Sequence, residues 1–458
     1  MSRRFLPLVA LSLVACSNSD TASTPDTSGG EDTSVVADGA SDTGTPLDTG
    51  TPLDTGVPLD TGVPVDTGAP VDGSPTDSTP SDAGCGPAPP APTTVLKPTP
   101  GELFYGQLGL GGLSIGESAI LVGPDGTVVV VDVGNDSHDD DVAKGLTDFT
   151  GATKVDHIVV THFHADHGDG LAGLLGRITL KGKIVHRGFT DFTAAANDAT
   201  IQGICNAIAA RPAAAGGLCN AASAPPCAPS SWAGSYPVAA CPGLATADLA
   251  LGSGALLDFV AANGFIGADR YDKVVSPFLT SDSNGENARS ILSVVQRGAF
   301  RMLLAGDLTG GGSVTDDVES FYASRLGAAA GIDARGVDVL HASHHGRNTS
   351  SNATWVARLL PADGKSRNAL MGVSTAHIGS PHAEVLTALL SSGRLSSGKA
   401  WTTRVATTGA TAAGLVDAQG GRILLATLEG GAAYAIQAVR ADGTLIESRA
   451  FRSVRACP

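Results

Sequence analysis

The stretch that decides how this chain folds and what it binds is residues 161–171, which reads THFHADHGDGL. Four potential metal ligands occupy six consecutive positions in it: His162, His164, Asp166 and His167. The apolar run 155–160 precedes them, so the loop leaves the end of a strand and turns into a helix. Imidazole and carboxylate groups spaced in this way predict a site for two adjacent cations such as zinc, manganese or iron.

Outward from this loop, apolar runs of strand length alternate with turns and one helical stretch. Residues 118–122 and 127–133 flank the turn residues Pro124-Asp125-Gly126, which predicts a buried hairpin. We expect a helix over 139–149 and a strand over 155–160. This alternation predicts an α/β fold.

The sequence HFHADH resembles the HxHxDH signature of the metallo-β-lactamase fold, an αββα four-layer sandwich that hosts hydrolases. VDVG at 131–134 resembles the family motif whose Asp orients the metal loop. LLAGD at 303–307 resembles the strand end whose Asp bridges both metals.

Further motifs follow in the order found in the hydrolase domain of bacterial competence (DNA-internalisation) proteins of the ComEC type: NARS at 287–290, HHG at 344–346 with TSS at 349–351, and PHAEVL at 381–386. The resemblance extends from about residue 101 to about residue 440, with an insertion. The transmembrane channel of the competence proteins is absent from this sequence, so DNA uptake through a pore is not carried over.

The resemblance implies two divalent metal ions, zinc or alternatively manganese, and it assigns their ligands. The first site would use His162, His164 and His186; the second would use Asp166, His167 and His345; Asp307 would bridge them. His186 fills the place of the family's third motif because it is the only histidine between His167 and His341. An incidental histidine at a strand end is the alternative.

Catalytic roles fall on Asp166, His344 and His382. The two histidines would contact the substrate and donate a proton to the leaving group. Spacing alone does not decide which member of the pair His344-His345 binds metal, although His345 is preferred.

The N-terminus carries an export signal. Arg3-Arg4 precedes an apolar run that is too short to span a bilayer, and residues 13–16, LVAC, resemble a bacterial lipobox. Residues 1–16 are therefore interpreted as a lipoprotein signal peptide, with a lipid anchor on Cys16 as the contact to a membrane. Ser17, unlike Asp, does not indicate retention at an inner membrane, so we expect the bacterial cell envelope, with the outer membrane or cell surface favoured.

Residues 17–100 are expected to be a disordered acidic tether. Residues 43–72 repeat a six-residue unit with Pro, Gly and Asp in each copy, which supplies no helical face and removes strand donors. A short-period β-solenoid is the alternative. The tether precedes a domain over 101–458.

Six cysteines remain after Cys16: Cys85, Cys205, Cys219, Cys227, Cys241 and Cys457. None has the close spacing of a zinc ribbon, so disulfides are favoured over a structural zinc. Cys85 and Cys457 flank the domain and could tie its ends together. The other four lie in an expected insertion at about 189–285, which we expect to overhang the site.

Charge narrows the functional classes. The net charge is −16, but residues 17–100 contain 13 acids and one base, and residues 1–16 contain two arginines, which leaves only −6 for residues 101–458. The domain therefore lacks the basic surface that binds nucleic acid by bulk charge.

The function expected from these features is a secreted, metal-dependent hydrolase of phosphodiester or nuclease type, acting on an anionic substrate such as a phosphodiester or nucleic acid. The alternatives are hydrolysis of another ester or amide, such as a phosphorylated wall component or a lactam, and a non-catalytic surface-binding protein on the same fold. No feature of the sequence indicates a protein partner. Residues 401–454 are expected to complete the second half of the sandwich.

Overall fold

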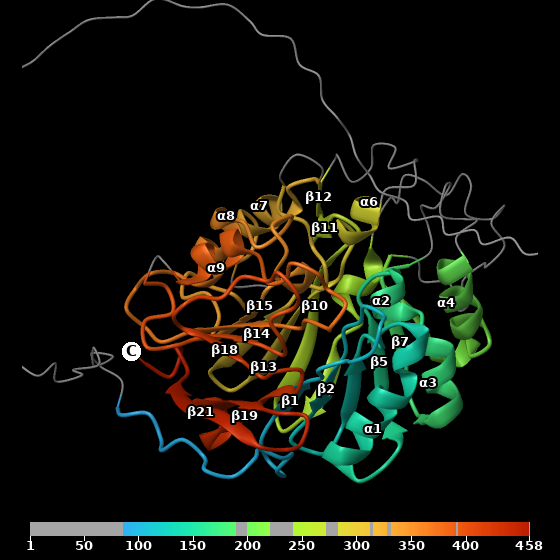
Figure 1. Cartoon of the computed structure of the whole chain (residues 1–458). Helices are drawn as coiled ribbons and strands as arrows, with labels where there is room; N and C mark the ends of the chain where they lie inside the picture. The colour runs from blue at the N-terminus through green and yellow to red at the C-terminus, as the bar shows by residue number, and fades with distance from the viewer. Residues whose placement is uncertain are drawn as a thin grey trace, which may run out of the picture. The chain divides into compact units, whose positions relative to one another are not determined.

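Two β-sheets lie face to face in the computed structural model, and helices cover the outer face of each (Figure 1). The first sheet has nine strands in the order β21-β20-β19-β1-β2-β3-β5-β7-β8. Its strands are β1 (Phe104–Gln107), β2 (Ala119–Val122), β3 (Val128–Val131), β5 (His157–Val160), β7 (Ile184–His186), β8 (Ala215–Gly217), β19 (Arg422–Leu428), β20 (Ala433–Val439) and β21 (Leu445–Arg452).

The second sheet has the order β12-β11-β10-β13-β14-β15-β16-β17-β18, with β9 paired to β10. Its strands are β9 (Leu249–Gly252), β10 (Ala255–Ala262), β11 (Phe265–Ile266), β12 (Asp269–Arg270), β13 (Leu292–Arg297), β14 (Phe300–Leu304), β15 (Val339–His341), β16 (Asn368–Met371), β17 (Ala400–Thr402) and β18 (Leu415–Asp417). A separate ribbon pairs β4 (Lys154–Val155) with β6 (Thr179–Leu180).

The helices are α1 (Asp139–Thr150), α2 (Ala165–Gly168), α3 (Leu171–Arg177), α4 (Ala199–Ala209), α6 (Ser283–Asn287), α7 (Val318–Ala323), α8 (Ala353–Leu359) and α9 (Ala383–Leu390). Short 3-10 helices are η1 (Asp136–His138), η3 (Pro212–Ala214), η4 (Pro242–Ala245), η7 (His344–Gly346) and η8 (Glu429–Gly431). Among the residues that the structure describes, no helix is both long and apolar enough to cross a membrane.

The structure describes residues 86–188, 199–219, 241–271, 283–311, 315–327, 331–390 and 393–457. The expected signal peptide at 1–16, with Cys16, and the repeats of the tether lie outside these ranges. So do Cys85 and Cys227.

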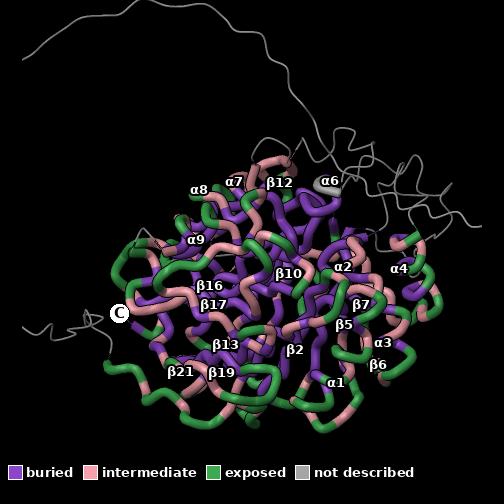
Figure 2. Tube along the Cα trace, in the orientation of Figure 1, coloured by how far each residue is buried: buried purple, intermediate pink, exposed green. Residues whose placement is uncertain are grey.

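Three apolar cores explain the four layers. Strand β3 shows the principle, because Val129 and Val131 belong to the core between the sheets, whereas Val128 and Val130 pack outward. The outward faces of the first sheet pack against α1, α3 and α4, and those of the second sheet pack against α7, α8 and α9. The buried segments run through both sheets (Figure 2). The predicted α/β four-layer sandwich is confirmed, as are the hairpin β2-β3 and the helix α1.

The end of the expected tether is part of the folded unit. The Gln437 side chain donates to the carbonyl oxygens of Pro92 and Thr94 and accepts the Leu96 N–H at 2.8 Å. Val95 and Leu96 pack against the core of the first sheet. Because these contacts fix residues 92–96 along β20, the tether cannot extend as a free segment to residue 100.

Part of the expected insertion is also integral to the sandwich. Strands β9 to β12 fall within 189–285, yet β10 pairs with β13 in the second sheet and carries Leu257 and Phe259 into the core between the sheets. Cys219 and Cys241 form a disulfide. Cys205 and Cys457 each take part in a disulfide as well.

The last three strands complete the first sheet instead of the second. Strand β19 pairs antiparallel with β1, with Leu425 opposite Tyr105, and β20 and β21 follow as neighbours. Only β17 and β18, from residues 400–417, extend the second sheet. The expectation for residues 401–454 is therefore wrong for its longest strands, because apolar periodicity identifies a strand but not its partner.

Candidate metal centre

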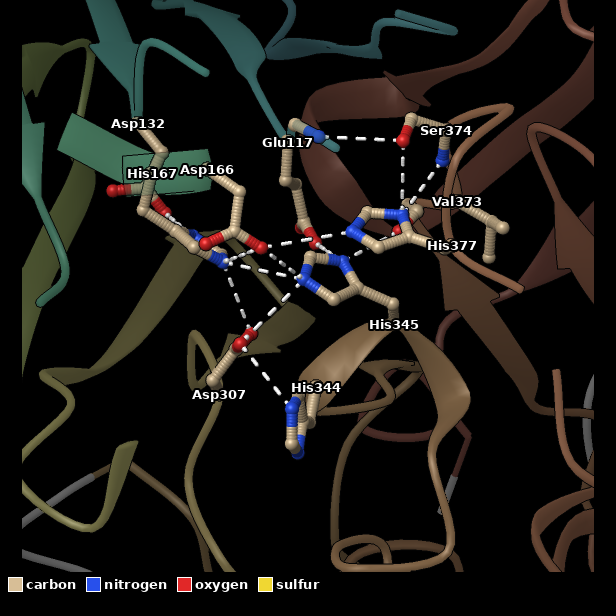
Figure 3. Close-up of polar contacts among 12 residues, drawn as sticks. Glu117, Asp132, Asp166, His167, Asp307, His344, His345, Val373, Ser374 and His377 are labelled. Carbon is tan, nitrogen blue, oxygen red and sulfur yellow. Dashed lines mark hydrogen bonds and ion pairs between the residues drawn. The ribbon is translucent and has the colours of Figure 1, made fainter. Parts of the chain in front are cut away.

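The predicted ligands come from loops that follow four strands in the two sheets. Asp132 follows β3, residues 161–168 follow β5, Asp307 follows β14, and His344 and His345 follow β15. Within each sheet the strands concerned run parallel, β3 with β5 and β14 with β15, so their carboxyl ends meet at one edge. Loops at this edge of a sheet are where α/β proteins build their sites. Figure 3 shows the side chains pointing toward one another.

Among the residues that the structure describes, three overlapping groups of side chains have the donor atoms and spacing to hold a metal. In each group the potential ligand atoms lie within 4.8 Å of one another: His162, His164 and Asp307; Glu117, His167, Asp307 and His345; Asp166, His345 and His377. Asp307 belongs to the first two groups, which agrees with the bridging role that the family resemblance implied.

The hydrogen bonds of His162 direct its Nε2 lone pair into the first group. Thr161 Oγ1 donates to Asp132 Oδ2 at 2.8 Å, so it accepts from His162 Nδ1 at 3.1 Å. Nε2 then carries the lone pair, and it lies 3.1 Å from His164 Nδ1 and 3.8 Å from Asp307 Oδ2. A neutral imidazole ligand requires this arrangement.

His167 and His345 are held in the same tautomer. His167 Nδ1 donates to Asp132 Oδ2 at 2.9 Å, and His345 Nδ1 donates to the Gly372 carbonyl at 2.8 Å. Their Nε2 atoms, which carry the lone pairs, face each other at 3.3 Å.

The arrangement of the donor atoms is more favourable with a bound cation than without one. Two lone pairs facing each other repel unless a proton or a metal lies between them, and His167 Nε2 is also 3.2 Å from Asp307 Oδ1. Asp307 Oδ1 is buried and makes no hydrogen bond within the described part of the chain. Three imidazoles with inward lone pairs and two carboxylates are suited to zinc or manganese.

The electrostatics of the cluster couple metal binding to protons. Burial raises the pKa of Asp307 and Asp166, but neighbouring imidazoles, His167 first, lower it well below the ordinary value. Burial lowers the pKa of His167 and His345, but the carboxylates, Asp307 first, raise it well above the ordinary value. Without metal the cluster therefore pairs ionised carboxylates with imidazoles that hold protons readily. A metal must displace these protons to bind.

The backbone of the ligand loops is strained where it positions these groups. His344 and His345 both have positive φ, 54° and 53°, a region that costs about 1–3 kcal/mol for a residue with a side chain. Gly306 precedes Asp307 with φ of 50°, and a Cβ there would lie 2.8 Å from Thr161 Oγ1. Only glycine lets the Asp307 loop approach the histidine loop this closely.

His344 lies beside the cluster but is turned toward other partners. Its Nδ1 lies 2.7 Å from Thr349 Oγ1, its Nε2 lies 3.3 Å from Asn287 Nδ2, and Asp307 Oδ2 is 3.8 Å away. His344 therefore lies beside Asp307 but outside the ligand groups, and it was expected from the sequence to contact the substrate.

The structure does not bring His186 or His382 into the three ligand groups. His186 Nδ1 accepts the Gly188 N–H at 3.2 Å, and its ring packs 6.1 Å from the Phe163 ring. His382 is half-buried at the start of α9, and its main-chain N–H donates to the Gly346 carbonyl at 2.9 Å. The motif order located both residues near the site but could not orient their side chains.

Arg187, the residue after His186, stabilises the loop that carries His162 and His164. Arg187 is fully buried and forms two hydrogen bonds of 2.7 Å to the Glu286 carboxylate. Glu286 Oε1 also accepts the Phe163 N–H at 2.8 Å, between the two histidine ligands. Asn263 Oδ1 accepts a third bond from Arg187 at 2.7 Å.

Residues next to Glu286 contact the other ligand segments. The Asp307 N–H donates to Ser290 Oγ at 3.2 Å, and the Ile291 N–H donates to the Thr161 carbonyl at 3.0 Å. Together with the Asn287 contact to His344, these bonds let residues 286–291 fix the relative positions of three loops. These are the loops that carry His162, Asp307 and His344. Residues 287–290 were recognised as a motif in the sequence, but the motif alone predicted no physical role for them.

Sequence reasoning missed Glu117 and His377. Glu117 lies 2.7 Å from His345 Nδ1 and 2.8 Å from His341 Nε2. Burial raises the pKa of Glu117, but His341 and then His345 lower it to below its usual range. Its position in the segment GES at 116–118, directly before β2, was the available signal, whereas His377 lies in a loop with no distinctive pattern.

We predict that Glu286→Gln destabilises the protein by about 3–5 kcal/mol, because it removes the carboxylate that forms two hydrogen bonds with the buried Arg187 guanidinium. Denaturant unfolding measures this, and Glu384→Gln, at an exposed position on α9, is the matched control with a change below about 0.5 kcal/mol. A Glu286→Gln protein as stable as the control would contradict the role of the ion pair.

We also predict that His186→Asn retains the full metal content, because His186 lies outside the ligand groups. His164→Ala should lose the first metal. Elemental analysis of both folded variants, with the unmodified chain alongside, decides between them. Equal metal loss in the two variants would restore His186 as a ligand.

The comparisons with known proteins agree with this site. Residues 115–195 match the family model described as metallo-beta-lactamase superfamily. That span contains Glu117, Asp132 and the ligand loop at 161–168. None of the curated proteins compared with the chain matches it.

The solved structures that are similar to this chain have low sequence identity to it. A diphosphatase from the PhnP family is 14% identical, with 70% of this chain and 96% of that chain covered and a TM-score of 0.31. A Cronobacter sakazakii metallo-beta-lactamase with a HARLDQ motif is 13% identical, with 51% and 73% covered and a TM-score of 0.28.

A subclass B3 metallo-beta-lactamase from a soil metagenome library is 11% identical, with 54% and 80% covered and a TM-score of 0.28. The family match covers residues 115–195, which contain the ligand loop, and the two sheets with helices on their outer faces form the four-layer sandwich expected from the resemblance to that superfamily.

Proposed function

We propose that this protein is an exported, lipid-anchored phosphodiesterase or nuclease that uses two divalent metal ions. The observation that carries the proposal is the position of Asp307, whose carboxylate belongs both to the group with His162 and His164 and to the group with His167 and His345. A carboxylate shared by two ligand sets would suit a site for two cations.

Each cation would have its own set of ligands, with Asp307 in both sets. His162, His164 and Asp307 would hold one cation, and Asp166, His167, His345 and Asp307 the other. When bound, two such cations supply a strong local positive charge and a water acidified toward neutrality. Asp132 fixes His162, through Thr161, and His167, so the loop keeps its geometry without the substrate.

Two of the chain's own groups beside Asp307 would orient an anionic substrate. His344 Nε2 and the Asn287 side chain amide lie together at 3.3 Å, beside Asp307. An amide donor and a protonated imidazole suit the oxygens of a phosphodiester. The ordered motifs shared with competence proteins support DNA or a related phosphodiester over a lactam or a wall ester.

We predict that the protein, loaded with zinc or manganese, hydrolyses bis-p-nitrophenyl phosphate and single-stranded DNA but not a chromogenic lactam. Asp307→Ala should lower the rate by more than about 100-fold and remove both metals, because its carboxylate serves both sites. Asp442→Ala, in an exposed turn between β20 and β21, is the control that keeps activity. Lactam turnover without phosphodiester turnover would replace the proposal with an amide hydrolase, and no turnover at all would support a binding protein.

The location is a separate part of the proposal. Cys16 lies outside the described residues, and the lipobox resemblance supports acylation at this position. In a bacterial host, Cys16→Ala should abolish labelling with a radioactive fatty acid and shift the protein from the membrane fraction to the soluble fraction. A Cys16→Ala protein that remains in the membrane fraction would contradict a lipid anchor on this residue.

A further inference from the structure

His377 is a buried histidine of the second ligand group for which neither the motifs nor the family match provides a role. It is only 2% exposed, and its ring stacks on the His345 ring at 3.8 Å with an interplanar angle of 21°. Its Nε2 lies 3.6 Å from Asp166 Oδ2 (Figure 3). By proximity alone, His377 would be counted as a metal ligand.

The hydrogen bonds of His377 are opposite to those of three other histidines in the cluster. His162, His167 and His345 each direct Nδ1 at an oxygen that accepts its proton. His377 Nδ1 faces the Ser374 main-chain N–H at 2.9 Å. A main-chain N–H can only donate, so His377 Nδ1 must be the acceptor.

The surrounding turn fixes this orientation. Ser374 Oγ lies 3.1 Å from His377 Nδ1, and the Gly116 N–H donates to the same Ser374 oxygen at 3.3 Å. The main-chain N–H of His377 donates to the Ser374 carbonyl at 3.3 Å. The ring is therefore held by its own turn and by the loop before β2, and both contacts are independent of any metal.

It follows that the neutral His377 ring carries its proton on Nε2. A protonated nitrogen has no lone pair to offer a metal, whereas it can donate a hydrogen bond. Within the described part of the chain, His377 Nε2 has no hydrogen bond, and the nearest acceptor recorded for it is Asp166 Oδ2.

We propose that His377 is a positioning residue and not a ligand: its Nε2–H is directed at Asp166 Oδ2 and orients that carboxylate toward the second cation. A carboxylate oxygen has two lone pairs, so Asp166 Oδ2 can accept from His377 and still face His345 Nε2 at 3.3 Å. Partners of this kind strengthen metal sites by about 10- to 100-fold in affinity. The inference rests on the proposed dinuclear site but not on its substrate.

The tautomer is measured directly by NMR of the full chain labelled with ¹⁵N-histidine and loaded with zinc. The His377 signals are identified as those missing from His377→Gln. We expect His377 with a protonated Nε2 and an unprotonated, hydrogen-bonded Nδ1, and His345 with a protonated Nδ1 and a zinc-bound Nε2. A zinc-bound Nε2 on His377 would overturn the proposal.

Metal binding provides the second readout. His377→Gln retains a donor near the position of Nε2, so it should keep two metal equivalents and an unchanged cobalt absorption spectrum, whereas His345→Gln should lose the second metal and change the spectrum. His377→Ala should weaken the second metal by about 10- to 100-fold. His157→Gln is the matched control, because His157 Nδ1 also accepts a main-chain N–H, from Lys183, but lies outside the ligand groups.

Two results would contradict the positioning role: metal loss in His377→Gln equal to that in His345→Gln, or unchanged affinity in His377→Ala. None of these measurements requires turnover. A protein that binds two metals with the expected tautomers but hydrolyses no phosphodiester would therefore reject the proposed function and leave the role of His377 intact.

Discussion

Inward-facing imidazole lone pairs around the buried Asp307 carboxylate are the constraint on which the rest of the structure depends. Such an arrangement is unfavourable unless a positive charge lies within it, because each group has left water without gaining a donor. The protein holds the imidazoles in place from outside through Asp132 and the Gly372 carbonyl. The cluster is therefore prepared for cations before they arrive, and a proton is the competitor that they displace.

The sandwich serves this cluster by bringing loops of both sheets to one place. The histidine loop belongs to the first sheet, and the Asp307 and His345 loops belong to the second. Gly306 permits their close approach, and the segment 286–291 ties them together through Glu286, Ser290 and Ile291. Arg187 neutralises Glu286 behind the loop, so this acid supports the backbone and does not compete for metal.

Local patterns predicted the parts of the fold that local physics determines. The ligand loop after β5, the hairpin β2-β3 and helix α1 follow from spacing, turn residues and periodicity. Strand pairing between distant segments does not, which is why the place of β19 to β21 and the role of β10 were not foreseen. The same limit applies to the site. Spacing identified His162, His164, Asp166 and His167, but it could not show that Arg187 pairs with Glu286 behind the ligand loop while His186 lies outside the ligand groups. Nor could it show that Glu117 and His377 reach the cluster from two other loops.

The central claim is that two cations share Asp307. Anomalous diffraction at the metal absorption edge, from crystals of the zinc-loaded or manganese-loaded protein, tests it most directly. The account predicts two peaks about 3.5–4 Å apart, one beside His162 and His164 and the other beside His167 and His345, with Asp307 between them. A single peak, or two peaks that do not share Asp307, would contradict the account.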